Sequence, residues 1–294
     1  MITELSILIP TYNQLCTQLV HDLYEQVRLL GIDYEIIIAD DGSTDKCIKQ
    51  KNSAISKLSH VYYITKEENR GRAAIRNFLA QQAQYDWLLF IDSDMVVCRT
   101  DFLRQYMAHD NEEVVYGGVI INGYQEGNLR CAYEHQTAHE HTLEKRQKRP
   151  YHDFHTANFM IRRERMIENP FDERYRQYGY EDVAFGILLK EKNIHILHID
   201  NPVSFEVYEN NSEFVNKTEE GLRTLWLFRE ELRDYSRLIQ AVASIPTPAL
   251  SLIRLWHTLF GQLERRQLTG SHPRQWMYHL YRIGYYASLK KLYG

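Results

Sequence analysis

The chain of 294 residues has few cysteines and no long apolar run. Its four cysteines, Cys16, Cys47, Cys98 and Cys131, include no C-x-x-C pair. We therefore expect neither a disulfide framework nor a zinc site, and a reducing compartment. No stretch approaches 18 apolar residues, so we expect no membrane-spanning segment. The start of the chain, MITELSILIPTYN, lacks a basic segment and a long apolar one, which argues against a signal peptide and for a cytoplasmic protein.

Charge is unevenly distributed. Hydrophobic residues make up 44% and charged residues 25% of the chain, as in ordinary globular proteins. The net charge is −4, yet the segment from Ser244 to Gly294 holds seven Lys or Arg and a single acid, Glu264. No nucleic-acid-binding motif accompanies this basic tail, so we expect no nucleic acid partner. Its apolar positions beside Arg and Lys predict helices that either lie on an anionic membrane surface or pack against the rest of the chain or a second subunit.

Over the first 100 residues, short β-rich runs alternate with helical patterns. Residues 6–9, 35–39, 61–64 and 87–91 are short, β-rich runs of the kind that fill a buried parallel sheet. Apolar residues at three- and four-residue spacing from Leu15 to Leu30 predict a helix that Gly31 closes, and residues 73–83 predict another. This alternation predicts an α/β fold with a mostly parallel central sheet flanked by helices.

The second half is less regular and then becomes helical. Residues 114–121, 158–162 and 194–199 predict strands, residues 134–149 a solvent-facing helix, and residues 181–192 another helix. Beyond residue 211 the pattern is wholly helical, and SIPTP at 244–248 breaks it. We therefore expect an α/β domain in residues 1–211 and a helical C-terminal extension in residues 212–294.

Three predicted strands end in polar loops, which read IPTYN, DDGSTD and DSD. In doubly wound sheets ligands bind beyond the carboxyl ends of the strands, so these loops predict one site. Asp41 can accept hydrogen bonds from a base or a sugar, although an acid there also suits a turn or a helix cap. Asp92 and Asp94 point the same way in an extended chain. Together with a diphosphate, these two carboxylates suit Mg²⁺ or Mn²⁺. A simpler interpretation is that they are solvated acids in a turn.

In order and spacing, IPTYN, DDGSTD, NRGRAAIRN and DSD resemble the N-terminal half of the inverting family-2 glycosyltransferases with the GT-A fold. Farther on, FDERYRQYGYEDVAFGILLKEKN at 171–193 resembles the ED segment of galactosyltransferase-like members. The resemblance covers about residues 6–225. It implies that residues 1–211 form a GT-A, Rossmann-like nucleotide-sugar transferase domain.

The resemblance also implies a role for individual residues. The donor nucleotide sugar would be bound by Pro10, Thr11, Tyr12, Asn13, Asp41, Asn69, Arg72, Asp92 and Ser93. Asp94 and Asp92 would hold Mn²⁺ or Mg²⁺, which neutralises charge on the departing nucleoside diphosphate. Asp182 would be the base that an inverting transfer requires, with Glu181 helping to hold the acceptor. Two acids also suit a helix N-terminus on electrostatic grounds alone, and the arginines of NRGRAAIRN suit an exposed helix start.

One position departs from the family pattern. Many relatives carry a V-Y-H-x-G sequence whose histidine completes the metal site, and here Phe205 takes the histidine position. Glu206 or His198 could substitute for it, but a histidine in an apolar strand is more typical of a core residue.

The resemblance implies transfer of a sugar from a nucleotide donor, a UDP-sugar if Asp41 takes the uracil, to a hydroxyl of a glycan or lipid-linked glycan. The setting would be bacterial surface-polysaccharide synthesis, in the cytoplasm or at the inner face of the cytoplasmic membrane. One alternative is a nucleotidyltransferase, although IPTYN lacks the Gly-rich basic loop expected for it. Another is a non-catalytic or weakly active nucleotide-sugar or glycan-binding protein of the same fold, which Phe205 favours. A dehydrogenase is disfavoured because no G-x-G-x-x-G occurs.

Overall fold

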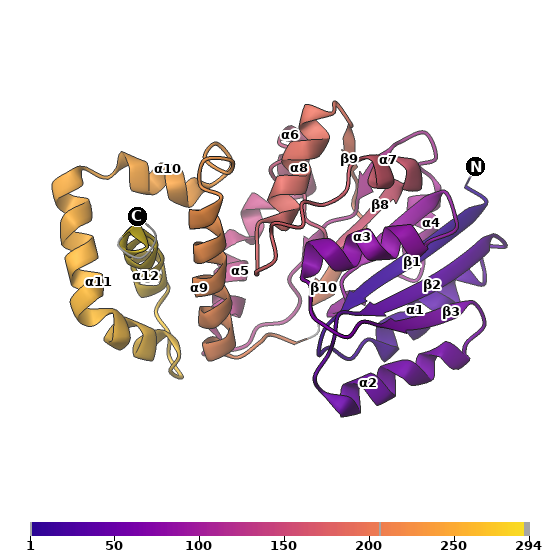
Figure 1. Cartoon of the computed structure of the whole chain (residues 1–294), viewed down its shortest axis with the longest axis horizontal. Helices are drawn as coiled ribbons and strands as arrows, with labels where there is room; N and C mark the ends of the chain where they lie inside the picture. Colours follow the sequence, from indigo (N-terminus) through magenta and orange to yellow (C-terminus); the bar gives the residue numbers. More distant parts are fainter. Residues whose placement is uncertain (1, 206, 291–294) are drawn as a thin grey trace. The chain divides into compact units, whose positions relative to one another are not determined.

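The structure, a computed structural model, describes residues 2–205 and 207–290 and contains two compact units (Figure 1). The first unit comprises Met1–Asn122, Glu140–Arg176 and Glu181–Glu206, and the second comprises Gly123–His139, Gln177–Tyr180 and Val207–Gly294. The division expected at residue 211 lies near the start of the last segment of the second unit. That unit also takes two short segments from the first 211 residues.

The first unit is built on a central sheet. Within the described ranges this sheet has seven strands in the order β3-β2-β1-β4-β8-β6-β9. Four of them run parallel and match the four predicted apolar runs: β1 (Glu4–Thr11), β2 (Asp33–Asp40), β3 (Val61–Thr65) and β4 (Trp87–Ile91). The other three are β8 (Asn158–Arg162), antiparallel to β4 and to β6 (Val114–Tyr116), and β9 (Ile196–His198), parallel to β6. The predicted fold, a mostly parallel sheet flanked by helices, is confirmed.

Side chains of the central strands alternate between two helical layers. Ile7 and Ile9 of β1 lie in the core shared with α1 (Thr17–Val27) and α4 (Phe102–Met107). Leu8, between them, faces the core shared with α3 (Arg72–Gln82), α7 (Arg163–Glu168) and α8 (Glu181–Glu191). Because successive residues of a strand point to opposite faces, a sheet covered on both faces needs apolar residues at every position. This explains the unbroken apolar run from Ile7 to Ile9.

A small second sheet in the first unit was not predicted. Its described strands are β5 (Met95–Val97), β10 (Val203–Phe205) and β7 (Val119–Ile120), with β10 in the middle. The predicted strand at 114–121 is broken into β6 and β7 at Gly117 and Gly118. A Cβ at Gly117 would lie 2.3 Å from the carbonyl oxygen of Asn201, so the close approach of two backbones requires glycine there.

Two helix predictions need correction. The first helix ends at Val27 rather than near Gly31, which has a φ of +67° and lies in the turn before β2. The expected solvent-facing helix at 134–149 is instead α5 (Leu129–Thr137), the 3₁₀ turn η2 (Ala138–Glu140) and α6 (Leu143–Lys148). Arg146 of α6 is buried and donates to the carbonyl oxygen of Ile199 at 3.1 Å. A buried guanidinium needs such acceptors, which only the folded chain reveals.

The second unit is helical, as predicted. It contains α5 together with α9 (Asn211–Leu227), α10 (Arg237–Ser244), α11 (Thr247–Leu268) and α12 (Gln275–Ser288). In Figure 1, α12 lies between α9 and α11. Its core contains Leu129, Val215, Leu268, Tyr278 and Tyr281. The SIPTP break separates α10 from α11, whose axes differ by 114°. Among the residues that the structure describes, no single helix is long and apolar enough to cross a membrane, whereas α10 and α11 taken together pass that test of length and composition.

Candidate active site

The loop after β1 is tied to the loop after β2. Asn13, at the end of IPTYN, accepts hydrogen bonds through its side-chain oxygen from the backbone N–H groups of Thr44 and Asp45 at 2.8 and 3.0 Å. The backbone N–H of Asn13 donates to the hydroxyl of Ser43 at 2.8 Å. Asn13 has a φ of +50°, a conformation that asparagine tolerates better than most residues. Thus two of the predicted site loops form one hydrogen-bonded surface.

The two acids of DDGS hold the neighbouring loops in place. Asp40 is fully buried and accepts from the backbone N–H of Ser43 at 2.7 Å and from the hydroxyl of Tyr63. Asp41 accepts from the backbone N–H groups of Arg70 and Gly71 at 3.1 and 2.9 Å. Burial raises the pKa of Asp41, and these two hydrogen bonds partly offset that rise. Asp41 therefore links the DDGS loop to the NRG turn.

Glycines let these loops pass one another closely. Gly42 has a φ of +76°, and a Cβ there would lie 2.7 Å from the carbonyl carbon of Glu68. Gly71 has a φ of +94°, and a Cβ there would lie 2.6 Å from the carbonyl oxygen of Arg176. Neither position accepts another residue without strain, because both the dihedral angle and the space require glycine. The two glycines explain why the motifs read DDG and NRG.

Helix α3 carries the second half of the NRGRAAIRN motif into the core. The side chain of Asn77 is buried and pairs with the backbone of Phe171, donating to its carbonyl oxygen and accepting from its N–H, both at 2.9 Å. It also donates to Glu173 at 3.1 Å. Asn77 thereby fixes the FDE segment that leads toward the ED sequence.

Arg76 joins the two predicted acidic groups. Its guanidinium donates to Asp92 at 2.6 Å through Nη2 and to Glu181 at 3.4 Å through Nη1. The Arg76 side chain is 1% exposed, Glu181 is 4% exposed and Asp92 is 20% exposed. This ion-pair chain brings the carboxyl end of β4 next to the N-terminus of α8. Nε of Arg76 has no hydrogen-bond partner among the residues described.

The pKa values of the two neighbouring carboxylates of α8 are shifted in opposite directions. Burial raises the pKa of Glu181, with the nearby arginines opposing the rise and Asp182 adding to it. Arg72, half-exposed, lies 3.9 Å from Glu181. Burial also acts to raise the pKa of Asp182. The hydrogen bond from His155, at 3.0 Å, and the charge of His155 outweigh this effect, so the pKa of Asp182 lies below its usual range. Asp182 is thus an ionised carboxylate oriented by a histidine.

The predicted metal ligands Asp92 and Asp94 lie in the turn that follows β4. Asp92 is engaged by Arg76, and Asp94 is half-buried in the turn between β4 and β5. Phe205 pairs with Met95, the residue after Asp94, so the departure from the family pattern lies beside the DSD turn. Glu206 lies outside the described residues. In the ranges 2–205 and 207–290, no group of three His, Cys, Asp or Glu side chains is arranged to hold a metal.

His198 is a core residue and not a substitute metal ligand. Its ring is buried against Tyr116, with centroids 5.2 Å apart. Nε2 lies 2.9 Å from the carbonyl oxygen of Pro150 and Nδ1 lies 3.3 Å from Arg146, so both nitrogens are used. Burial lowers the pKa of His198 to about 4. His198 is therefore the core histidine that its position in an apolar strand favoured, and it does not replace the missing metal ligand.

The other residues expected to bind the nucleotide-sugar donor lie in these loops or at the strand ends next to them. Thr11 is buried and donates to the carbonyl oxygen of Gln14 at 3.0 Å, while the ring of Tyr12 is 45% exposed. Pro10 pairs with Ala39 in the sheet. Asn69 is exposed and accepts from the N–H of Gly71 at 3.0 Å, and Ser93 is half-buried within the DSD turn.

Arg76, Asn77 and His155 were not predicted as site residues. The first two lie in the NRGRAAIRN motif, and Arg76 follows Arg72 by four residues, which places both on one face of a helix. That spacing could have identified Arg76 as a partner for the acids. No local pattern indicates His155, because its contact with Asp182 joins positions 27 residues apart.

Solved structures define the class of this fold. A mannosyltransferase from Pyrobaculum calidifontis, solved in complex with GDP-Man and Mn2+, superposes with a TM-score of 0.55 at 14% identity over 98% of this chain and 87% of that one. Residues 1–349 of TarS from S. aureus, solved in complex with UDP-GlcNAc, superpose with a TM-score of 0.53 at 16% identity over 99% of this chain and 91% of that one. The fold is the GT-A fold of glycosyltransferases.

Sequence comparison defines the family. The model of glycosyl transferase family 2 matches residues 6–168, which is more than half of the chain. An uncharacterized glycosyltransferase of Haemophilus influenzae is 26% identical over 233 residues, covering 78% of this chain and 89% of the relative. The chain belongs to glycosyl transferase family 2 and is a glycosyltransferase.

Proposed function

We propose that this glycosyltransferase is inverting and uses Asp182 as its base. The observation that carries the proposal is the ion-pair chain from Asp92 through Arg76 to Glu181. It brings the DSD turn, where the resemblance implies the donor diphosphate, next to the first turn of α8. Asp182 follows Glu181 directly, so the proposed base lies at the same end of the sheet as the proposed donor site.

The donor in this proposal is a nucleotide sugar bound by the loops after β1, β2 and β4. The exposed ring of Tyr12 offers a face on which a base can stack. Asp41 is held in place by two backbone N–H groups, as a residue that recognises uracil would need to be. The TarS structure contains UDP-GlcNAc and the mannosyltransferase structure contains GDP-Man, and both share this fold. With Asp41 as the base-recognition residue, we propose a UDP-sugar.

The acids of the DSD turn suit a divalent metal ion that the protein and the donor would bind together. Asp94, together with the Asp92 oxygen that does not face Arg76, supplies hard carboxylate oxygens suited to Mn²⁺ or Mg²⁺. Because few protein ligands converge there, most of the coordination would come from the diphosphate and water. The ion, when bound, neutralises charge on the leaving diphosphate.

The chemical step proposed here is one in-line displacement. Asp182 accepts the proton of the acceptor hydroxyl while that oxygen forms a bond to the anomeric carbon. The bond from this carbon to the diphosphate oxygen breaks, and the nucleoside diphosphate leaves with the bonding electrons. His155 holds the pKa of Asp182 below its usual range, so the carboxylate is ionised at neutral pH and carries no proton of its own before the transfer. Arg72, half-exposed beside Glu181, suits a contact with a donor phosphate.

The acceptor in this proposal is a hydroxyl of a glycan or a lipid-linked glycan, as in surface-polysaccharide synthesis, and the enzyme works on the cytoplasmic side of the membrane. These assignments rest on the family resemblance of the motifs.

A donor screen tests the proposal. Protection of the protein from thermal unfolding and slow donor hydrolysis would be measured across UDP-, GDP- and dTDP-sugars, each with and without Mn²⁺. We expect one nucleotide class to give both protection and release of nucleoside diphosphate. Protection without release under all conditions would favour a binding protein of the same fold. Release of pyrophosphate from a nucleoside triphosphate and a sugar phosphate would favour a nucleotidyltransferase.

A further inference from the structure

Helix α11 presents an apolar face to solvent. Six large hydrophobic side chains recur along it at three- and four-residue spacing and are 38–67% exposed: Leu252, Leu255, Trp256, Leu259, Phe260 and Leu263. Five of them, all but Leu263, line a shallow apolar groove with Ile253 and with Leu280 of α12. The helix has 22 residues and is therefore about 33 Å long. Contiguous apolar surfaces of this kind on a folded protein mark a contact with something else.

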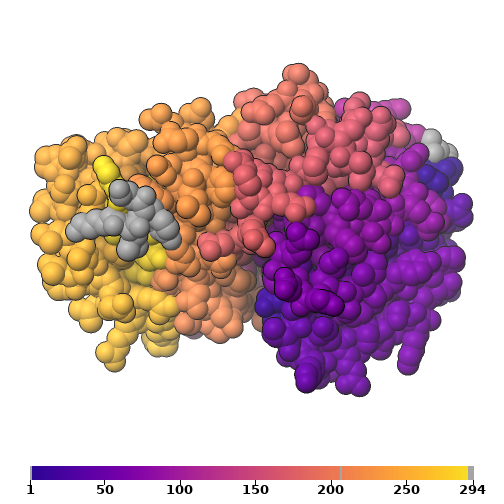
Figure 2. Space-filling view, in the orientation of Figure 1, coloured from indigo at the N-terminus to yellow at the C-terminus, as the bar shows by residue number. Residues whose placement is uncertain are grey.

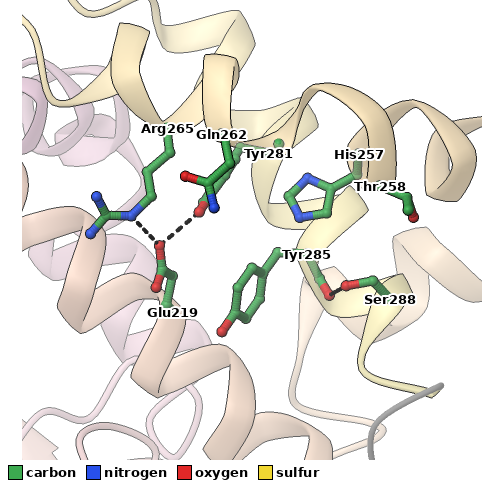
Figure 3. A pocket seen from close by; sticks show the side chains of 9 residues that line it. Glu219, His257, Thr258, Gln262, Arg265, Tyr281, Tyr285 and Ser288 are labelled. Carbon is green, nitrogen blue, oxygen red and sulfur yellow. Dashed lines mark hydrogen bonds and ion pairs between the residues drawn. The ribbon is translucent and has the colours of Figure 1, made fainter.

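The opposite face of α11 is polar and faces its own unit. His257, Gln262 and Arg265 point toward α9 and α12, where they line a pocket of about 510 Å³ with Tyr281 and Tyr285 of α12 (Figure 3). Arg265 donates to Glu219 of α9 at 2.9 Å, and the hydroxyl of Tyr281 donates to the same carboxylate at 2.7 Å. Helices at the surface of a globular protein bury their apolar side and expose their polar side. Helix α11 contributes Leu268 to the core of its unit but turns most of its large apolar side chains outward, where they lack a partner within the described part of the unit.

The sequence that carries this face has a positive net charge. From Tyr235 to Gly294 the chain has eight Lys or Arg and one acid, Glu264. Glu264 is buried and accepts hydrogen bonds from the indole N–H of Trp256 and from His257, both at 2.8 Å, so it adds no negative charge to the surface. Arg266 and Arg274 are exposed near the end of α11 and the start of α12, and Trp276 beside them is 56% exposed. The surface of these helices is shown in orange and yellow in Figure 2.

We propose that α11 lies flat on an anionic lipid bilayer, with its six exposed apolar side chains embedded at the level of the headgroups. An interfacial helix has this combination of an apolar face, basic flanks and aromatic residues at its border. Lipid fits better than a second copy of the chain. In a two-fold dimer each subunit uses the same surface. The segment from Tyr235 to Gly294 has one acid, the buried Glu264, so it would offer no exposed carboxylate to Arg266 and Arg274 of the other copy. Anionic headgroups instead pair with Arg266 and Arg274.

Flotation with vesicles tests this proposal on the full chain. Vesicles of phosphatidylglycerol and of phosphatidylcholine would be used without any nucleotide sugar, so the result is independent of transfer activity. We expect binding to phosphatidylglycerol vesicles that weakens as salt rises. L255S/L259S removes two embedded side chains and should weaken binding more than tenfold. The control L29S/I167S changes two exposed apolar residues of the first unit and should bind as the wild type does. R266Q/R274Q should weaken binding roughly fivefold for each charge removed.

Several results would overturn the proposal. One is wild-type protein that does not float with phosphatidylglycerol vesicles. Another is that the L255S/L259S variant binds phosphatidylglycerol vesicles as tightly as the L29S/I167S control does. A third is wild-type protein that forms a dimer without binding vesicles and becomes monomeric in L255S/L259S, which would assign the face to a second copy. A second measurement does not depend on the serine substitutions. It records how far lipids with brominated acyl chains quench the tryptophan fluorescence of the bound protein. Emission from Trp256 must be quenched in the wild type, and that part of the quenching must disappear in W256F.

Discussion

Replacing Arg76 with methionine probes the ion-pair chain at the centre of the site. R76M keeps much of the length of the side chain and removes its charge. It leaves Glu181, which is 4% exposed, with the longer contact to Arg72 at 3.9 Å, and it leaves Asp92 without its ion pair with Arg76 at 2.6 Å. Breaking a buried ion pair by removing one partner costs about 3–5 kcal/mol. We expect R76M to lose about that much of the free energy of unfolding at neutral pH.

The pH dependence gives the prediction a second test. Without Arg76, burial raises the pKa of Glu181 further above its value in the unfolded chain. A group with a raised folded pKa stabilises the fold below its unfolded pKa and loses that contribution as pH rises through the folded value. The deficit of R76M should therefore be smaller near the usual Glu pKa of about 4.3 and larger at neutral pH. R76M/E181Q should recover part of the loss at neutral pH.

The assay is urea unfolding followed by the fluorescence of Trp87, a buried residue of β4, with Trp226, Trp256 and Trp276 of the second unit replaced by phenylalanine. R28M is the matched control. Arg28 pairs with Glu25 on the surface at 3.2 Å, and loss of such a pair changes stability by less than about 1 kcal/mol. An R76M variant as stable as R28M at neutral pH would refute the reasoning.

Three further predictions concern the site. H155A removes the hydrogen bond that lowers the pKa of Asp182, so the acid limb of kcat/KM against pH should move to higher pH, and an unmoved limb would exclude the pairing. G71A forces a Cβ against the carbonyl oxygen of Arg176 at a φ of +94° and should destabilise the first unit by about 1–3 kcal/mol in thermal melts, where G31A, with open space, should cost less. D94A should abolish the Mn²⁺ dependence of UDP binding in calorimetry, and unchanged metal dependence would remove Asp94 as a ligand.

The central sheet was predictable because its strands carry a strong local pattern. Residues 87–91 are apolar at every position, as a strand covered on both faces must be, and they form β4. The small sheet was not predictable, because β5, β7 and β10 have two or three residues each and are joined only by long-range pairing. A periodicity cannot be read from so few positions.

The site was predictable as a set of loops but not as a network. The acids at 92, 94, 181 and 182 were recognised from their motifs, and the structure joins Asp92 to Glu181 through Arg76. Arg146 was expected in a solvent-facing helix and is buried against the end of β9. In both cases a buried arginine finds its acceptors on distant segments, and such partners depend on the tertiary fold. The reversed polarity of α11 was also hidden, since an amphipathic pattern does not reveal which face points outward.

The role of Asp182 as the base is the central part of the proposed mechanism, and one measurement tests that role. Transfer by D182N would be compared with that of the wild type, using the donor identified by the screen and with UDP binding measured on the same preparations. We expect turnover to fall by about 10²–10⁴-fold while UDP binding is unchanged, because the amide keeps the shape of the carboxylate but cannot accept the proton. Turnover by D182N within a few fold of the wild type, with UDP binding intact, would contradict it.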